Sequence, residues 1–215
     1  QQDAFAIASV QRAQHATKDG LFQAEIAPVT VKGRAGDTVI AIDEGPGKVK
    51  LDKIPALKPA FKKDGGTITA ASSSSINDGA AALVMSTASH AQKIGAKPIA
   101  RIVAHSTHAQ QPEWFSTAPV GAVHKLFAKT GWSTKDVDLW EVNEAFAVVP
   151  MALMKELGVS HDIVNVHGGA CALGHPIGAS GARIMVTLIH ALQQRGKKRG
   201  VATLCIGGGE GTAVA

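Results

Sequence analysis

Three polar residues lie where predicted strands end, and each type can move a proton or stabilise a developing negative charge. Asn143 follows the apolar segment "VDLWEV", His175 lies in the glycine-rich stretch "GGACALGHPIGASGAR", and Cys205 closes the segment "GVATL". In sheets built from alternating strands and helices, ligands bind at the carboxyl ends of the strands. The three residues come from separate segments yet point to one edge of a sheet. This coincidence favours a catalytic site that combines an amide, an imidazole and a thiol.

Each of these residues also has an ordinary structural role open to it. Asn143 can cap the helix that follows it. A histidine in a Gly-Pro turn is commonly structural, and a buried cysteine at a strand end often packs as a small apolar residue. Each role is the more common one for its residue taken alone, and only the predicted convergence of the three favours chemistry.

Glycines surround the candidate residues and would let a substrate approach the backbone closely. The run "GGGEG" begins at Gly207 and leaves backbone N–H groups unshielded, as an oxyanion hole requires. The stretch "GASGAR" opens a helix whose N-terminus favours negative charge. As a dinucleotide-binding fingerprint "GGGEG" fails, because neither a helix nor a ribose-binding acid follows it.

A metal site is the alternative that one spacing leaves open. His167, Cys171 and His175 are four residues apart and would share one face of a continuous helix. Gly168, Gly169, Gly174 and Pro176 interrupt that helix, so we expect no metal here and interpret Cys171 as a packed thiol. A metal-dependent hydrolase would instead predict bound zinc.

The composition limits the class of protein. The chain has 215 residues, 45% of them hydrophobic, and a formal net charge of +5. Its length suits one large or two small domains. No apolar run is long enough to span a membrane, and two cysteines are typical of a reduced intracellular protein, with the cytoplasm as the default compartment. The basic residues are scattered and the cluster "RGKKRG" reads as a solvated turn, so we expect no nucleic acid partner.

Alternating segments indicate an α/β protein with a largely parallel sheet and helices on its faces. A loop is expected over 43–66. Helices are predicted over 3–19, 87–95, 118–131, 144–158 and 177–196. Strands are predicted over 25–32, 38–43, 80–86, 98–106, 137–143, 162–166 and 200–208.

Several motifs together resemble the thiolase family. "NEAFA" at 143–147, the glycine-rich stretch at 168–183 and "CIGGGEG" at 205–211 resemble the three C-terminal signatures of thiolases. "QDAFAIASVQRA", "EIAPV", "LKPAF" and "SSINDGAAALVMS" are similar to the family's loop domain and the segment after it, in the same order. Within the family, the resemblance is strongest to the acetoacetyl-CoA thiolase (acetyl-CoA C-acetyltransferase) branch.

The resemblance implies a thiolase fold, in which two similar halves stack as α/β/α/β/α layers and a loop domain holds coenzyme A. Residues 1–76 would form the latter part of the CoA-binding loop domain. Residues 77–96 would close the N-terminal half, and 97–215 would form the C-terminal thiolase domain.

The resemblance also implies a role for each candidate residue. Cys205 would be the acid/base that takes or returns the proton α to the thioester carbonyl, with a pKa tuned by neighbouring dipoles. His175 would donate a hydrogen bond to the thioester oxygen and help activate a nucleophilic thiolate. Asn143 would hold a water that completes this oxyanion hole, and the backbone N–H of Gly207 would contribute to a second one.

Coenzyme A and acetyl-CoA are implied as substrates, with no covalently bound cofactor. Ser74 would touch the pantetheine arm, Ala70 would line the same channel, and Lys48 and Lys50 would lie near the 3′-phosphate of the nucleotide. The basic balance of the chain would then serve a polyanionic substrate.

The implied reaction is the reversible condensation of two acetyl-CoA to acetoacetyl-CoA and CoA by a ping-pong mechanism. Its nucleophile is another cysteine in the family's N-terminal half, and neither cysteine here has that motif around it. We therefore expect this chain to need the N-terminal half as a partner and to be inactive alone. A homotetramer is usual in this branch, and mitochondrial or peroxisomal location stays open. A degradative 3-ketoacyl-CoA thiolase and a non-catalytic CoA-binding fragment are the alternatives.

Overall fold

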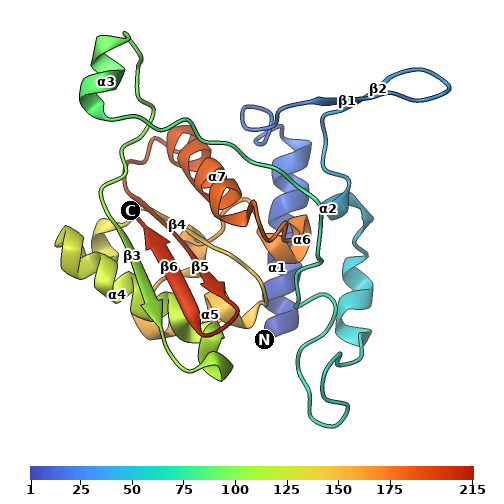
Figure 1. The fold of residues 1–215 in the computed structure, drawn as a ribbon. Coiled ribbons are helices and arrows are strands. Elements are labelled where there is room, and N and C mark those ends of the chain that lie inside the picture. Colours follow the sequence, from blue (N-terminus) through green and yellow to red (C-terminus); the bar gives the residue numbers. More distant parts are fainter.

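A four-stranded sheet with helices on both faces forms the C-terminal part of the protein, whose computed structural model describes all 215 residues (Figure 1). The strands lie in the order β3 (His105–Ala109), β6 (Glu210–Val214), β5 (Gly200–Ile206) and β4 (Leu139–Val142). Strands β4 and β5 run parallel, whereas β6 is antiparallel to both β3 and β5. The predicted α/β class is right, but the prediction of a largely parallel sheet is wrong.

A glycine turn after β5 produces the antiparallel pairing. Residues 207–209 reverse the chain, and Gly208 and Gly209 have φ angles of 102° and 93°, a region that residues with a Cβ rarely adopt. Strands β5 and β6 consequently form a hairpin in which Cys205 lies opposite Gly211. The strand predicted over 200–208 therefore ends at Ile206, and β6 follows it in the same sheet.

Alternating residues of the central strands supply two cores. Helices α4 (Ala118–Thr130) and α5 (Val148–Leu157) cover one face, where Trp140 and Val201 are buried. Helix α7 (Ser180–Gln194) covers the other face, where Leu139 and Ala202 are buried. Neighbouring residues of one strand thus face opposite layers, as the period of two requires.

The first part of the chain packs beside this sheet through a helix. Helix α1 (Gln2–Lys18) confirms the helix predicted over 3–19, and it contacts α6 (Ala170–Leu173), α2 (Gly45–Lys48) and the 3₁₀ turn η1 (Leu51–Ala56). Because α2 and η1 lie within 43–66, the prediction of a loop over that whole segment is wrong. Strands β1 (Val29–Val31) and β2 (Thr38–Ile40) form an exposed antiparallel ribbon that projects from the body (Figure 1).

Two predicted strands form incompletely or not at all. Residues 80–86 have no regular structure, and Val84 in this apolar run is fully exposed at 103%. Of the segment 98–106, only the end from His105 joins the sheet, as part of β3. An apolar segment becomes a strand only where another strand takes up its backbone hydrogen bonds, and no strand of this chain lies beside residues 80–86. The short helix α3 (Ala88–Lys93) follows this run as predicted.

An asparagine side chain replaces the strand predicted over 162–166. The backbone N–H of Asn165 donates to the carbonyl of Trp140 at 2.9 Å, and its φ angle is 48°. Its side-chain Oδ1 then accepts from the N–H of Val142, and its Nδ2 donates to the carbonyl of Val142, both at 2.8 Å. The amide therefore continues the pairing with β4 that a single parallel bridge between Val164 and Trp140 begins. Apart from that bridge, the segment forms only the 3₁₀ turn η4 (His161–Ile163).

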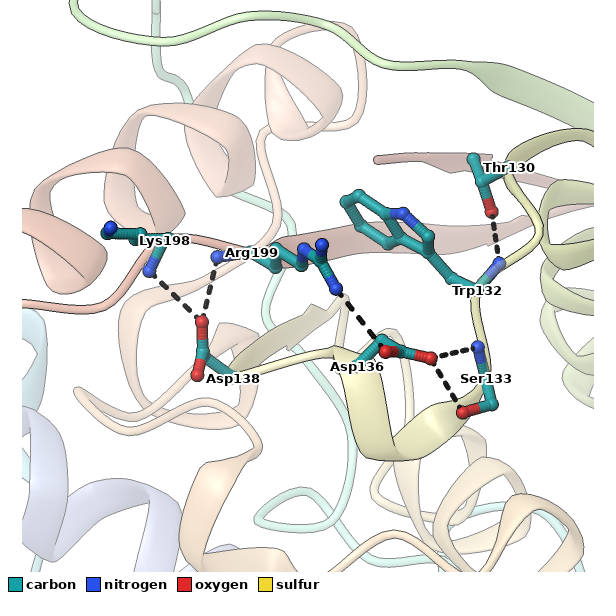
Figure 2. A network of polar contacts seen from close by, with 7 residues as sticks. All are labelled: Thr130, Trp132, Ser133, Asp136, Asp138, Lys198 and Arg199. Atoms are coloured by element: carbon teal, nitrogen blue, oxygen red, sulfur yellow. Dashed lines mark hydrogen bonds and ion pairs between the residues drawn. The ribbon is translucent and has the colours of Figure 1, made fainter.

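A polar network fixes the amino ends of β4 and β5 (Figure 2). The Asp138 carboxylate accepts the backbone N–H groups of Lys198 at 3.0 Å and of Arg199 at 2.9 Å. These hydrogen bonds, that from Arg199 first, lower the pKa of Asp138. Residues 195–199 of "RGKKRG" are exposed, as predicted, whereas Gly200 is buried as the first residue of β5. The turn is held to β4 by the Asp138 carboxylate.

A second carboxylate supports the same end. Asp136 closes the 3₁₀ turn η3 (Thr134–Asp136) by accepting from the backbone and hydroxyl of Ser133, both at 2.8 Å. It also pairs with the guanidinium of Arg199 at 3.3 Å, and Arg199 lies over the Trp132 ring at 5.2 Å (Figure 2). The remaining turn, η2 (Pro112–Thr117), leads into α4. No helix is both long and apolar enough to cross a lipid bilayer.

Replacing Asp138 by alanine removes the acceptor for two N–H groups, so the free energy of unfolding should fall by about 1 kcal/mol at pH 7. The folded-state pKa of this carboxyl is lowered, so its contribution is present above the ordinary aspartate pKa and is lost as the pH falls. Urea unfolding at pH 7 and pH 3 measures both effects. Asp64→Ala on the surface is the control, and an equal loss at both pH values would contradict this explanation.

Candidate active site

A run of serines connects the two motifs that carry Asn143 and His175. Ser72 accepts the N–H of Ala147 at 2.9 Å. Ser74 donates both its N–H, at 3.1 Å, and its hydroxyl, at 3.0 Å, to the carbonyl of Ala145. The motif "NEAFA" therefore pairs sideways with the serines. Helix α5 consequently begins at Val148 and not at 144 as predicted.

The same run continues onto the glycine-rich loop. The carbonyl of Ser75 accepts the N–H of His175 at 2.8 Å, and Ile76 forms a parallel bridge with His175. The side chain of Asn77 lies so close to Gly174 that a Cβ there would collide with it. Main-chain hydrogen bonds thus hold the two motifs at a fixed separation on either side of residues 72–77.

Asn143 and His175 meet at the carboxyl end of the central strands, as their positions in the sequence predict. The N–H of Asn143 extends the pairing of β4 with β5 by donating to Thr203 at 3.0 Å. The Asn143 side chain is only 1% exposed, and its Nδ2 lies 3.3 Å from Nε2 of His175. Cys205 lies on β5, two residues beyond Thr203, and so at the same end of the sheet.

Cys205 is packed among apolar side chains. Its residue is 6% exposed and belongs to the core that β5 forms with α4 and α5. Burial raises the pKa of its thiol to about 11, so the sulfur carries its proton at neutral pH. Burial outweighs the backbone hydrogen bond that lowers the pKa of this thiol, so the dipole tuning expected from the sequence does not dominate.

The hairpin turn beyond Cys205 is open. Gly207 is exposed, and a Cβ built on it would meet no atom within 4 Å. Its backbone is therefore accessible to a ligand that approaches the strand ends.

The residues expected to contact coenzyme A lie at or near the surface and do not converge on one point as Asn143 and His175 do. Ser74 is half-buried and its hydroxyl is used by Ala145, whereas Ala70 is exposed. Lys48 pairs with Glu44 at 2.7 Å on the surface, and Lys50 is also exposed.

The residues of the metal alternative do not form a site. Burial raises the pKa of the Cys171 thiol well above its usual value, and its Sγ faces the carbonyl of Glu144 at 3.9 Å. His167 packs edge-on against Phe22, and burial lowers its pKa to about 4. No three His, Cys, Asp or Glu side chains come together to hold a metal ion.

Sequence reasoning missed a buried glutamate beside Asn143. The Glu144 carboxylate is fully buried and accepts from the Ser9 hydroxyl at 2.7 Å, from Asn165 Nδ2 at 2.8 Å and from the Cys171 N–H at 3.0 Å. The Ser9 hydroxyl in turn accepts the N–H of Gly169 at 3.0 Å. The signal in the sequence was a charged residue inside an otherwise apolar stretch, "EVNEAFAVV".

Comparisons with known proteins identify the family of the chain. The family model for the thiolase C-terminal domain matches residues 96–215, and that for the thiolase N-terminal domain matches residues 1–89. The chain therefore belongs to the thiolase family.

Several of the similar proteins are named acetyl-CoA acetyltransferases. The chain is 50% identical over 215 residues to the cytosolic acetyl-CoA acetyltransferase of Mus musculus. This match covers 99% of this chain and 54% of the mouse protein. The crystal structure of the Bacillus anthracis acetyl-CoA acetyltransferase superposes with a TM-score of 0.95 at 43% identity, over 99% of this chain and 54% of that one. The crystal structure of an Ascaris suum thiolase in complex with coenzyme A superposes with a TM-score of 0.88 at 43% sequence identity, over 99% of this chain and 54% of that one.

These superpositions confirm the predicted thiolase fold. The chain spans about half the length of the curated relatives it matches.

Exchanging Glu144 for glutamine places an amide N–H₂ where one carboxylate oxygen now accepts a hydrogen bond. We expect the free energy of unfolding to fall by about 1–3 kcal/mol, because a buried donor or acceptor is left unpaired. Chemical denaturation followed by circular dichroism measures this. Glu156→Gln, at an exposed position of α5, is the matched control and should change little. Equal stabilities for the two variants would show that the Glu144 contacts are not required.

Both thiols should resist alkylation while the chain is folded, because their raised pKa values leave little thiolate at pH 7.5. Iodoacetamide should label Cys205 at least ~100-fold more slowly than in the urea-unfolded chain, given an ordinary thiol pKa near 8.5. Mass spectrometry of labelled peptides over time gives the two rates. Labelling of Cys205 at the unfolded rate would rule out a protonated, buried thiol.

Proposed function

We propose that this chain supplies the acid/base and oxyanion-hole residues of a thiolase that interconverts two acetyl-CoA with acetoacetyl-CoA and CoA. The observation that carries the proposal is the contact of Asn143 with His175 at the end of β4 and β5, on which Cys205 also lies. The 50% identity to a mouse acetyl-CoA acetyltransferase supports the short acyl substrate over a longer ketoacyl-CoA.

Cys205 would transfer the proton at the α carbon. In thiolysis the nucleophilic cysteine of the N-terminal half would attack the 3-keto carbonyl of acetoacetyl-CoA and take the acetyl group, to be passed on to CoA. The carbon–carbon bond would break, and the Cys205 thiol would give its proton to the departing acetyl-CoA carbanion. In condensation the thiolate takes that proton back as the new bond forms. A thiol pKa of about 11 suits the first direction, because the sulfur is protonated before the bond breaks.

His175 and Asn143 would stabilise the negative charge that develops on the thioester oxygen. Burial, with a contribution from Arg183, lowers the pKa of His175 and keeps its ring neutral at physiological pH. The Oδ1 of Asn143 is buried and makes no hydrogen bond within the protein, which suits it to hold the water that the family resemblance implies. The accessible N–H of Gly207 would serve the second oxyanion hole.

Coenzyme A would reach this site along the serine run. Ser74, which bonds Ala145 of "NEAFA", would touch the pantetheine arm, and the exposed Ala70 would line the same channel. Lys48 and Lys50 would add positive charge near the nucleotide phosphates. The Ascaris suum thiolase that carries coenzyme A superposes on 99% of this chain, which supports the same ligand here. We place the loop domain at 1–76 and the closing segment of the N-terminal half at 77–96.

The decisive test complements this chain with the part of the mouse enzyme that the match does not cover. Thiolysis of acetoacetyl-CoA should then occur and should fall by about 100-fold or more in Cys205→Ser, since a serine hydroxyl is a far weaker acid/base at this site. Lys93→Ala on the exposed helix α3 is the control and should keep full activity.

Two outcomes would replace the proposal. A higher kcat/KM with a longer ketoacyl-CoA would make the protein a degradative thiolase. Coenzyme A binding without turnover by the complemented chain would make it a CoA-binding fragment.

Location and assembly are part of the same proposal. The mouse relative is named as a cytosolic enzyme, which supports a cytosolic location that cell fractionation can test. A homotetramer of the complemented protein remains our prediction, and light scattering after size-exclusion chromatography measures it.

A further inference from the structure

Ser180, the first residue of α7, contacts the ring nitrogen of His175 that faces away from Asn143. Its hydroxyl oxygen lies 2.5 Å from Nδ1 of His175 and 3.1 Å from the carbonyl oxygen of Pro176. The side chain is only 1% exposed, so water cannot take the place of either partner. The hydroxyl is thus buried between the imidazole and the backbone of its own turn.

With Nδ2 of the Asn143 amide facing the ring, the donors and acceptors around His175 fit together in one arrangement. The Nδ2 of Asn143 can only donate, so Nε2 of His175, 3.3 Å away, must accept and carries no proton. A neutral ring with a bare Nε2 carries its proton on Nδ1, which donates to Oγ of Ser180. The hydroxyl proton of Ser180 is then directed to the Pro176 carbonyl, which can only accept.

We propose that Ser180 is a positioning residue that holds His175 as the Nδ1-protonated tautomer, with Nε2 bare toward the site. The tautomer is argued from contacts alone, whereas its effect on catalysis rests on the proposed function. A bare Nε2 can take the proton of an attacking thiol, and the sulfur becomes a thiolate. The same nitrogen then carries the proton that donates to the thioester oxygen. The opposite tautomer could donate but could not first accept.

The backbone at Ser180 keeps this arrangement in place without help from the side chain. The N–H groups of Ala179 and Ser180 donate to the Pro176 carbonyl at 2.7 and 2.9 Å. Removing the hydroxyl therefore leaves the turn and the start of α7 intact. It deprives the ring of the only acceptor that faces Nδ1, and this makes the tautomer the quantity to measure.

The first experiment uses this chain with ¹⁵N-labelled histidine and two-bond ¹H–¹⁵N correlation, which tells a protonated ring nitrogen from a bare one. His175→Asn assigns the signal among the nine histidines. The unsubstituted chain should show a protonated Nδ1 and a bare Nε2 at pH 7.5. Ser180→Ala should shift the ring toward the Nε2-protonated tautomer. Ser180→Thr, which keeps the hydroxyl, should restore the first pattern, and Ser89→Ala on the surface should not change it.

A protonated Nε2 in the unsubstituted chain would overturn the proposal without any variant, as would an unchanged tautomer in a folded Ser180→Ala. The second experiment measures thiolysis in the complemented enzyme. There Ser180→Ala should lower kcat by about 10- to 100-fold with little change in KM, because the substrate contacts remain while Nε2 already carries the proton that it should first accept. The tautomer result stands even if the complemented enzyme has no thiolase activity, so the failures of the two proposals are distinguishable.

Discussion

The buried carboxylate of Glu144 is the constraint on which the site depends. A charged group in the interior is tolerated only where hydrogen bonds replace its water, and three donors do so here. They come from α1, from the turn at Asn165 and from the start of α6, so the carboxylate fixes three segments at once. Asn143 directly precedes Glu144 in the chain, and its position is set by the same contacts.

Around that carboxylate, the site is assembled mainly from backbone pairing. The serine run takes up the N–H and carbonyl groups of "NEAFA" on one side and of the His175 turn on the other. Polar groups held by main-chain hydrogen bonds do not need to reorganise when charge develops on a substrate. Helix α1 contributes Ser9, whose hydroxyl connects Glu144 with the backbone of Gly169. Helix α7 contributes Ser180, whose hydroxyl contacts the ring of His175.

Local patterns were enough to predict helices, because the hydrogen bonds of a helix lie within its own segment. Helix α4 ends where Gly131 adopts a φ of 71°, and Gly20 and Gly158 end α1 and α5 in the same conformation. The positions of Asn143 and Cys205 at the ends of β4 and β5 were likewise visible, because two parallel neighbours present their carboxyl ends at one edge of the sheet. His175 reaches the same edge without the strand predicted before it, because its N–H is held by the carbonyl of Ser75.

What the sequence could not disclose depends on contacts between distant residues. The run 80–86 has the composition of a strand but no strand beside it. Residues 162–166 pair with β4 only through one bridge at Val164 and through the side chain of Asn165. Ser9 and Glu144 are 135 residues apart, so nothing local marks their contact. Ser180, which contacts Nδ1 of His175, lies only five residues away in the sequence. The irregular turn that brings it back to the ring has no helix or strand periodicity by which it could be predicted.

The substitution of an amide for a strand at β4 has a consequence for association between molecules. Strand β4 is at the edge of the sheet, where free backbone groups would offer a template for a strand of another chain. The carbonyl of Trp140 and both backbone groups of Val142 are already taken by Asn165. The bridge of Val164 to Trp140 and the amide of Asn165 therefore occupy this edge, which disfavours the addition of a strand from another chain at the border nearest the candidate site.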